Sequence, residues 1–203
     1  MMTSEFVKKL STEIPQHIIC YGCSLTANGA WVEHLKCVLA EKYPNLATVS
    51  NSGCGGKWSK WGLENLDTRV IEKSPNTVII EFSMNDAFLE YETDVPTAKN
   101  YLCSMIENIL EYNSETEIIL MVMNPPTGSH LAKRPDFNKY NQMYREVALE
   151  KSLMLVDHQP NWEFILKEGI EKYLEYVPDG IHPSPDGCKK VISPYLLKSL
   201  GIT

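Results

Sequence analysis

The sequence lacks any long hydrophobic run, because its longest apolar stretches, such as residues 118–123, are far too short to cross a bilayer. It also lacks an excess of basic residues. The formal net charge is −7, which argues against a nucleic-acid partner, since phosphate binding needs a basic surface. The 203 residues are 43% hydrophobic and 22% charged, as in an ordinary globular chain. Membrane-spanning, fibrous and disordered classes are therefore excluded, and a nucleic-acid-binding protein is disfavoured.

The chain lacks a dense cluster of cysteines, and its beginning does not resemble an export signal. Residues 1–9 contain no basic region followed by a long apolar stretch and a small-residue cleavage site. The 6 cysteines are spread from residue 20 to residue 188 rather than packed into a short segment. We therefore expect reduced thiols and a cytoplasmic protein.

No repeat, low-complexity tract or flexible linker divides the chain, so we expect a single domain over residues 1–203. Short apolar runs predict strands. These runs are continuous rather than alternating, which is typical of strands covered on both faces of a parallel sheet. They lie at residues 17–21, 46–50, 77–82, 117–122 and 153–157.

Segments with helical spacing of apolar residues separate or follow these runs. They cover residues 31–43, 99–112, 137–150 and 188–200, and we expect Pro194 to bend or end the last one. Strands that alternate with helices predict crossover units, and hence an α/β fold with a parallel sheet and helices on both faces. In such a fold the ligand site lies beyond the carboxyl ends of the strands.

Four segments in the expected position carry polar or glycine residues. Ser24 follows the first strand, glycines at 53, 55 and 56 follow the second, and Asn85-Asp86 follows the third. The fourth segment, Asp179-Gly180-Ile181-His182-Pro183, precedes the last helix. Taken singly, each of these fits a helix cap, a turn or an exposed loop. Their common location is what indicates a site.

These residues resemble the conserved blocks of the SGNH (GDSL-type) hydrolases, which supply a Ser, a Gly, an Asn and a His in that chain order. Gly22-Cys23-Ser24-Leu25 is similar to the Gly-Asp-Ser-Leu block, residues 51–56 to the second block, Ser83-Met84-Asn85-Asp86 to the third, and residues 179–182 to the Asp-x-x-His block. Two positions depart from the pattern: Cys23 stands in place of Asp, and Ser83 in place of Gly.

The resemblance implies a fold and a set of roles. The fold is a three-layer α/β/α sandwich whose five-stranded parallel sheet has the flavodoxin-like order. Ser24 would be the nucleophile, His182 the base and Asp179 the residue that orients His182. The oxyanion would be bound by the backbone N–H of Ser24, the backbone N–H of Gly56, with Gly53 a weaker candidate, and the side-chain amide of Asn85. The chemistry needs no metal and no organic cofactor.

The substrate is predicted from the loops around this site. Residues 124–136 contain Lys133 and Arg134, and we interpret the segment as a mobile, polar lid rather than an acyl groove. Lys57, Trp58 and Met84 are candidate substrate contacts. We expect an esterase that hydrolyses a small acyl ester, in particular an O-acetyl group on a carbohydrate, with a lipase, a thioesterase or an acyl-transferring enzyme as alternatives. No nucleic acid or membrane partner is expected, and the oligomeric state is not readable.

Two other classes of function remain as alternatives to an ester hydrolase. Cys20-Tyr21-Gly22-Cys23 is a C-x-x-C sequence after a strand, where a thioredoxin-like redox site would lie. A zinc site on these thiols is disfavoured, because His17 and His34 do not complete a recognised ligand spacing. The second class is a non-catalytic carbohydrate-binding relative, in which Trp31, Trp58 and Trp61 would stack on a sugar. Core packing is the simpler explanation for these tryptophans.

Overall fold

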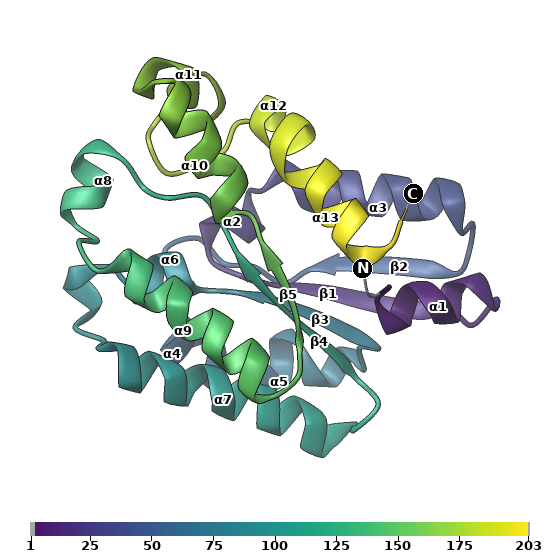
Figure 1. Ribbon diagram of the computed structural model, residues 1–203. Helices are drawn as coiled ribbons and strands as arrows, with labels where there is room; N and C mark the ends of the chain where they lie inside the picture. Colours follow the sequence, from purple (N-terminus) through teal and green to yellow (C-terminus); the bar gives the residue numbers. More distant parts are fainter. Residues whose placement is uncertain (1–2, 203) are drawn as a thin grey trace.

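The computed structural model describes residues 3–202, which contain a five-stranded, fully parallel sheet (Figure 1). Its strand order is β2-β1-β3-β4-β5, so the α/β fold and the flavodoxin-like order are confirmed. Each predicted run forms a strand, and the bounds agree to within one residue at each end. The strands are β1 (Gln16–Gly22), β2 (Ala47–Asn51), β3 (Thr77–Glu81), β4 (Glu117–Val122) and β5 (Met154–Asp157).

Helices cover both faces of the sheet, which gives three layers (Figure 1). The helices α1 (Glu5–Ser11), α3 (Ala30–Lys42) and α13 (Ser193–Leu200) lie on one face, and α4 (Ser59–Glu64), α5 (Leu66–Arg69), α7 (Val95–Tyr112) and α9 (Phe137–Glu150) lie on the other. The two described ends of the chain meet, since Ser4 N donates to Leu200 O at 3.2 Å. The apolar side chains between these layers form one continuous core.

The two edge strands differ from the prediction of burial on both faces: β5 is buried only at Val156, and β2 is more exposed still. The central strand β3 is buried along its whole length, but β2 is only partly buried, and Thr48 and Asn51 are exposed. The reason is its place at the edge of the sheet, where β1 is its one strand neighbour. The apolar run at residues 46–50 therefore identified a strand correctly, but it did not reveal that the strand is peripheral.

Helix α7 begins earlier than its apolar spacing predicted. The helix starts at Val95 rather than near residue 99, because Asp94 caps it: Asp94 Oδ1 accepts a hydrogen bond from Thr97 N at 2.8 Å. Pro96 occupies the first turn, where its missing N–H costs nothing. The sequence Asp94-Val95-Pro96 is a typical helix start, so the beginning of α7 could have been predicted from it.

The last helical segment does not end early at Pro194, so one of the two effects expected of this residue is wrong. Helical structure runs from α12 (Pro185–Gly187) through a π-helical turn at Cys188–Ile192 into α13, without an early end. Pro194 lies in the first turn of α13, directly after the wider turn. A π-helical turn of this kind accommodates a residue that lacks a backbone N–H, which explains why the segment continues.

Several short elements had no apolar spacing long enough to predict them. Most lie at the end of the sheet where the strands finish, or pack beside it. They are α2 (Ser24–Ala27), α6 (Ser83–Asp86), α8 (Gly128–Ala132), α10 (Gln159–Glu168), α11 (Ile170–Tyr176) and the 3₁₀ turns Ile71–Lys73 and Leu89–Tyr91. Among the described residues, none of the helices has both the length and the apolar character that a membrane span requires.

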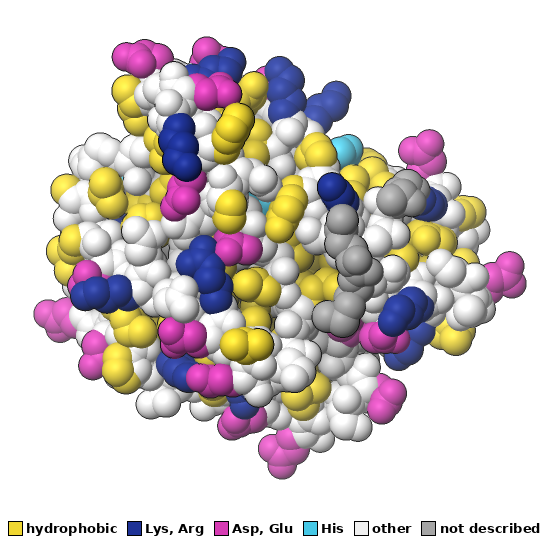
Figure 2. Space-filling model, viewed as in Figure 1, with side chains coloured by type: hydrophobic (Ala, Val, Ile, Leu, Met, Phe, Trp, Pro, Cys, Tyr) yellow, Lys and Arg dark blue, Asp and Glu magenta, His cyan; other side chains and the backbone are white. Residues whose placement is uncertain are grey.

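The surface mixes charges of both signs. On the face shown in Figure 2, acidic and basic side chains alternate over the helices, with apolar side chains between them, and no patch of one sign dominates. The acidic balance of the sequence is therefore spread over this face rather than concentrated in one place.

Candidate active site

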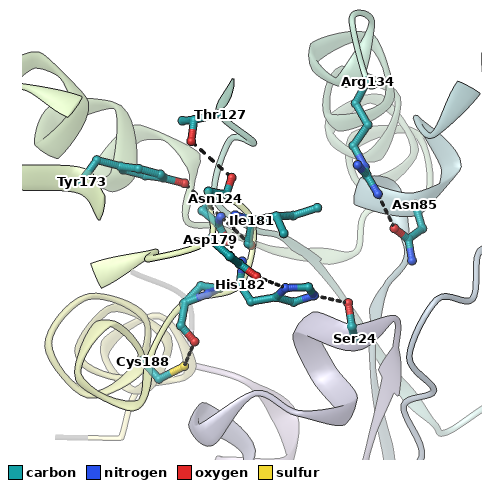
Figure 3. A network of polar contacts seen from close by, with 12 residues as sticks. Ser24, Asn85, Asn124, Thr127, Arg134, Tyr173, Asp179, Ile181, His182 and Cys188 are labelled. Atoms are coloured by element: carbon teal, nitrogen blue, oxygen red, sulfur yellow. Dashed lines mark hydrogen bonds and ion pairs between the residues drawn. The ribbon is translucent and has the colours of Figure 1, made fainter. Parts of the chain in front are cut away.

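Three of the predicted residues meet at the carboxyl end of the sheet. Ser24 is the first residue of α2, directly after β1, and His182 and Asp179 belong to the loop between α11 and α12. Ser24 Oγ lies 2.8 Å from His182 Nε2, and His182 Nδ1 lies 2.7 Å from Asp179 Oδ2 (Figure 3). The chain therefore brings a hydroxyl, an imidazole and a carboxylate into one hydrogen-bonded row.

Asp179 is held as a carboxylate by its own loop. Its Oδ1 accepts hydrogen bonds from the backbone N–H of His182 at 2.7 Å and of Ile181 at 3.0 Å. Partial burial alone would raise the pKa of Asp179, but these backbone donors and the His182 ring lower that pKa to about 2. The group facing His182 Nδ1 is therefore negatively charged near neutral pH.

The Asp179–His182 loop is attached to the segment that follows β4. Thr127 N donates to Gly180 O at 2.8 Å, and Asn124 Nδ2 donates to Ile181 O at 3.0 Å. Asn124 Nδ2 also lies 3.0 Å from the hydroxyl oxygen of Tyr173, which in turn donates to Pro125 O. Sequence reasoning did not identify these supports, because nothing in the spacing of residues 124–127 relates them to residues 179–182.

The glycine loop after β2 contains both candidate glycines for the second oxyanion donor. Gly53 N donates to Asn51 Oδ1 at 3.0 Å, so this N–H is already occupied. Within residues 3–202, the N–H groups of Gly56 and Ser24 donate to no protein acceptor. Gly56 is exposed and has a φ of +66°, which favours glycine at this turn. Of the two glycines, Gly56 is therefore the one available to a ligand.

Asn85 contributes an amide whose two ends have different partners. It lies in α6, directly after β3, and its side chain is 5% exposed. Asn85 Nδ2 donates to Lys57 O at 3.0 Å, and Asn85 Oδ1 accepts from Arg134 Nη2 at 3.1 Å. In Figure 3 the amide oxygen faces Arg134, and the amide nitrogen faces away from it, on the side of Ser24.

The segment at residues 124–136, interpreted from the sequence as a mobile, polar lid, is buried at its beginning and at Arg134, and mostly exposed between residues 128 and 136. Asn124, Pro125 and Pro126 are buried, and α8 occupies its middle. Arg134 is 6% exposed and faces Asn85, so it is not a surface cation for an anionic substrate. Lys133 is exposed, and its Nζ lies 4.0 Å from Glu90.

The three predicted substrate contacts lie in different environments. Lys57 and Trp58 are half-buried and follow Gly56 directly. The Trp58 ring is stacked on the Tyr91 ring, with the ring centroids 4.2 Å apart and the planes at 12°. Met84 is only 3% exposed, and its side chain belongs to the core, so a substrate contact at Met84 does not agree with its burial.

The side chains of Cys23 and Ser83, the two residues that depart from the family pattern, point into the protein interior. Cys23 Sγ donates to the buried carboxyl of Glu81 at 3.3 Å, and Thr26 Oγ1 donates to the same carboxyl at 3.1 Å. Burial raises the pKa of Glu81 to about 8. Ser83 Oγ donates to Asn141 Oδ1 at 2.8 Å, towards α9. Neither side chain therefore occupies the space next to Ser24 Oγ.

The burial of the thiols contradicts the redox interpretation of the C-x-x-C sequence. Cys20 and Cys23 are free and fully buried, and burial raises the pKa of both thiols well above the ordinary value. A redox dithiol needs an accessible sulfur of lowered pKa. Within the described part of the chain, no group of three or more His, Cys, Asp and Glu side chains is arranged to hold a metal ion.

Core packing explains two of the tryptophans. Trp31 is fully buried, and its Nε1 donates to Leu25 O at 2.8 Å. Trp61 is half-buried, packs on the core and lies near the ring of Tyr21. Only Trp58 is next to the candidate site, through its neighbours Gly56 and Lys57. The three rings therefore do not form one sugar-binding surface.

A small cavity adjoins Ser24 and His182. Its volume is about 210 Å³, and it is lined by Ser24, Leu25, Asn28, Gly29, His182, Pro183 and Cys188. A larger hollow of about 390 Å³ lies far from this row, beside α1 and the amino ends of β4 and β5. The smaller cavity is the one next to the hydroxyl and imidazole groups.

Known proteins are similar to this chain in sequence. The family model of the GDSL-like lipase/acylhydrolase family matches residues 19–190. An arylesterase of Vibrio mimicus is 25% identical over 190 residues, which are 89% of this chain and 86% of the arylesterase.

Solved structures are similar as well. A lipase/acylhydrolase from Enterococcus faecalis has a TM-score of 0.78 and 24% identity, covering 91% of this chain and 95% of its own. An acetylxylan esterase from Geobacillus stearothermophilus has a TM-score of 0.80 and 20% identity, covering 94% and 96%. Since the family model matches most of the sequence, the chain belongs to the GDSL-like lipase/acylhydrolase family, and it is an ester hydrolase.

Proposed function

We propose that the protein is a serine esterase in which Ser24 is the nucleophile, His182 the general base and Asp179 the residue that orients His182. The observation that carries this proposal is the row of two short contacts, 2.8 Å from Ser24 Oγ to His182 Nε2 and 2.7 Å from His182 Nδ1 to Asp179 Oδ2. The Asp179 carboxylate requires the proton on Nδ1, which leaves Nε2 free to accept the proton of Ser24.

The reaction then proceeds through an acyl-enzyme. Ser24 Oγ forms a bond to the ester carbonyl carbon while its proton passes to His182 Nε2. The bond to the leaving alcohol breaks, and the alcohol takes that proton from His182. A water molecule, deprotonated by His182, attacks the acyl group and releases the acid, which restores Ser24. Asp179 stabilises the imidazolium in both halves.

The negative charge on the carbonyl oxygen is stabilised by three donors. These are the backbone N–H groups of Ser24 and Gly56, which have no protein acceptor in the described chain, and one hydrogen of Asn85 Nδ2. The other Nδ2 hydrogen is used by Lys57 O. The three groups come from the ends of β1, β2 and β3, which are neighbours in the sheet. Loss of one such donor costs about 100- to 1000-fold in rate.

The substrate that fits best is a small acyl ester, in particular an O-acetyl group on a carbohydrate. The cavity of about 210 Å³ beside Ser24 is smaller than the roughly 300 Å³ at which drug-sized ligand sites begin, so it suits a short acyl group. The half-exposed Trp58 ring next to Gly56 offers a flat apolar surface for a sugar ring. The similarity of fold to an acetylxylan esterase also supports this choice.

The nucleophile is tested by labelling with a fluorophosphonate, followed by mapping of the modified residue by mass spectrometry. We expect modification at Ser24, and we expect Ser24→Ala to lose labelling together with hydrolysis of aryl acetates. Ser129→Ala, which changes an exposed serine in α8, is the matched control and keeps both. Modification elsewhere, or equal activity of Ser24→Ala and the unchanged protein, would refute the assignment.

The substrate is tested separately with p-nitrophenyl esters of increasing acyl length and with an acetylated xylo-oligosaccharide. We expect kcat/KM to be higher for the acetate than for the octanoate, and acetate to be released from the sugar. A preference for the octanoate would favour a lipase or thioesterase and refute only the substrate. Transfer of the acetyl group to an added alcohol in preference to water would identify an acyl transferase.

A further inference from the structure

Arg134 is a buried cation that has no ion-pair partner among the described residues. It lies between α8 and α9, is 6% exposed, and its guanidinium carbon lies 4.6 Å from the centre of the Phe88 ring. Across residues 3–202, no carboxylate lies within ion-pair distance of its guanidinium, and the neighbouring Glu90 is paired with Lys133 instead. A charge that is buried without a counter-ion is costly, so its polar contacts need an explanation.

The polar contacts of Arg134 converge on α6. Arg134 Nε donates to Met84 O at 2.9 Å, and Arg134 Nη2 donates to Asn85 Oδ1 at 3.1 Å. A third, longer contact of 3.5 Å joins Nη1 to His130 O in α8. The planar guanidinium thus binds the backbone of one residue and the side chain of the next at the same time. A lysine ammonium has no such fork of donors in one plane.

We propose that Arg134 is a positioning residue that fixes the orientation of the Asn85 amide. This inference rests on the esterase mechanism proposed above. A guanidinium only donates, so it can bind only the oxygen end of the amide. Asn85 Nδ2 is therefore held at the opposite end, where it contacts Lys57 O and keeps one hydrogen for the substrate.

The alternative orientation shows why this matters. If the amide turned over, Asn85 Oδ1 would face both Lys57 O and the developing oxyanion, and two pairs of acceptors would repel each other. The same turn would bring the NH₂ group against the donors of Arg134. Arg134 therefore excludes the unproductive orientation of the Asn85 amide.

The test is a double-mutant cycle between Arg134 and Asn85, with kcat and KM measured on an aryl acetate. We expect Arg134→Gln and Arg134→Lys to lower kcat by about 100-fold with KM changed less than threefold, because the lost contact acts on the transition state. In the Asn85→Ala background, Arg134→Gln lowers kcat by less than about fivefold further, because the group that it orients is gone.

Controls separate positioning from folding. Lys139→Met removes an exposed cation of α9 and leaves kcat unchanged. The thermal midpoint of each Arg134 variant is measured, and Arg134→Lys, which keeps the charge, is used if Arg134→Gln does not fold. Losses that multiply in the double variant, or an Arg134→Gln variant with unchanged kcat, overturn the inference. The esterase proposal fails instead if Ser24→Ala retains activity, whatever the cycle shows.

Discussion

At the scale of single residues, the candidate site depends on the Asp179 carboxylate, because both of its oxygens accept hydrogen bonds that hold the catalytic loop and the His182 ring. Asp179 uses one oxygen for two backbone N–H groups and the other for His182 Nδ1. A neutral amide cannot reproduce this pattern, because an amide has only one accepting end. The charge of Asp179, and not only its shape, is therefore needed to keep His182 in the tautomer that accepts a proton from Ser24.

Asp179→Asn is the corresponding variant. We expect the amide oxygen to keep the two backbone donors, so that its NH₂ group faces His182 Nδ1 and the ring hydrogen moves to Nε2. His182 then cannot accept the Ser24 proton, and kcat on an aryl acetate falls by about 10⁴-fold. Asp186→Asn, an exposed aspartate in the next helical turn, is the control and retains kcat. A fall smaller than tenfold for Asp179→Asn would show that the charge is not needed.

At the scale of elements, the position of His182 is set by contacts between two loops that are far apart in the sequence. Gly180 has a φ of +83°, and a Cβ atom at this position would lie 2.7 Å from Thr127 Oγ1. A side chain at residue 180 would therefore displace the Thr127 hydroxyl and press on the Thr127 carbonyl oxygen, 3.3 Å from the added Cβ, so glycine favours the close approach to the segment after β4. This approach is also what allows the hydrogen bond from Thr127 N to Gly180 O.

Gly180→Ala tests this packing, and Gly128→Ala is a matched control. Both glycines have a positive φ, but an added Cβ at Gly128 would meet no atom within 4 Å. We expect both variants to lose about 1 kcal/mol of stability from the backbone conformation. Only Gly180→Ala should lower kcat, by about 100-fold, because an ångström-scale displacement of His182 is enough for such a loss. Equal kcat values for the two variants would contradict this account.

The elements also show what could be predicted from the sequence. The apolar runs identified all five strands, because burial in a parallel sheet leaves a local signature, and the residues at their ends marked the site. Arg134 could not be assigned correctly in the same way. Its neighbours Lys133, Pro135 and Asp136 indicate an exposed loop, and its burial depends on Met84 and Asn85, about fifty residues earlier in the chain. Tertiary contacts of this kind leave no local pattern.

At the scale of the whole molecule, three fully buried titratable groups link stability to pH. Burial raises the pKa of Glu81 to about 8 and that of Asp86 to about 7, and burial lowers the pKa of His158 to about 3. The two carboxyl groups favour the folded state at low pH and lose this contribution as the pH rises. His158 has the opposite effect, because the unfolded chain binds its proton first as the pH falls below about 6.5.

Glu81→Gln should therefore make the stability of the protein depend less on pH between pH 5 and pH 8. An unfolded Glu81 ionises from about pH 4.5, whereas the folded one stays protonated until about pH 8, so the unchanged protein loses stability across this interval. We expect its thermal midpoint to fall between pH 5 and pH 8 by roughly 10 °C more than that of Glu81→Gln, because the raised pKa of Glu81 corresponds to a loss of about 3.5 kcal/mol over this pH interval and about 1 kcal/mol corresponds to 2–4 °C for a chain of this size. Glu41→Gln, an exposed change in α3, should follow the unchanged protein. If the profiles of Glu81→Gln and Glu41→Gln run parallel over this range, Glu81 is ionised in the folded protein, and the buried carboxyl beneath Ser24 carries a charge that the catalytic groups must accommodate.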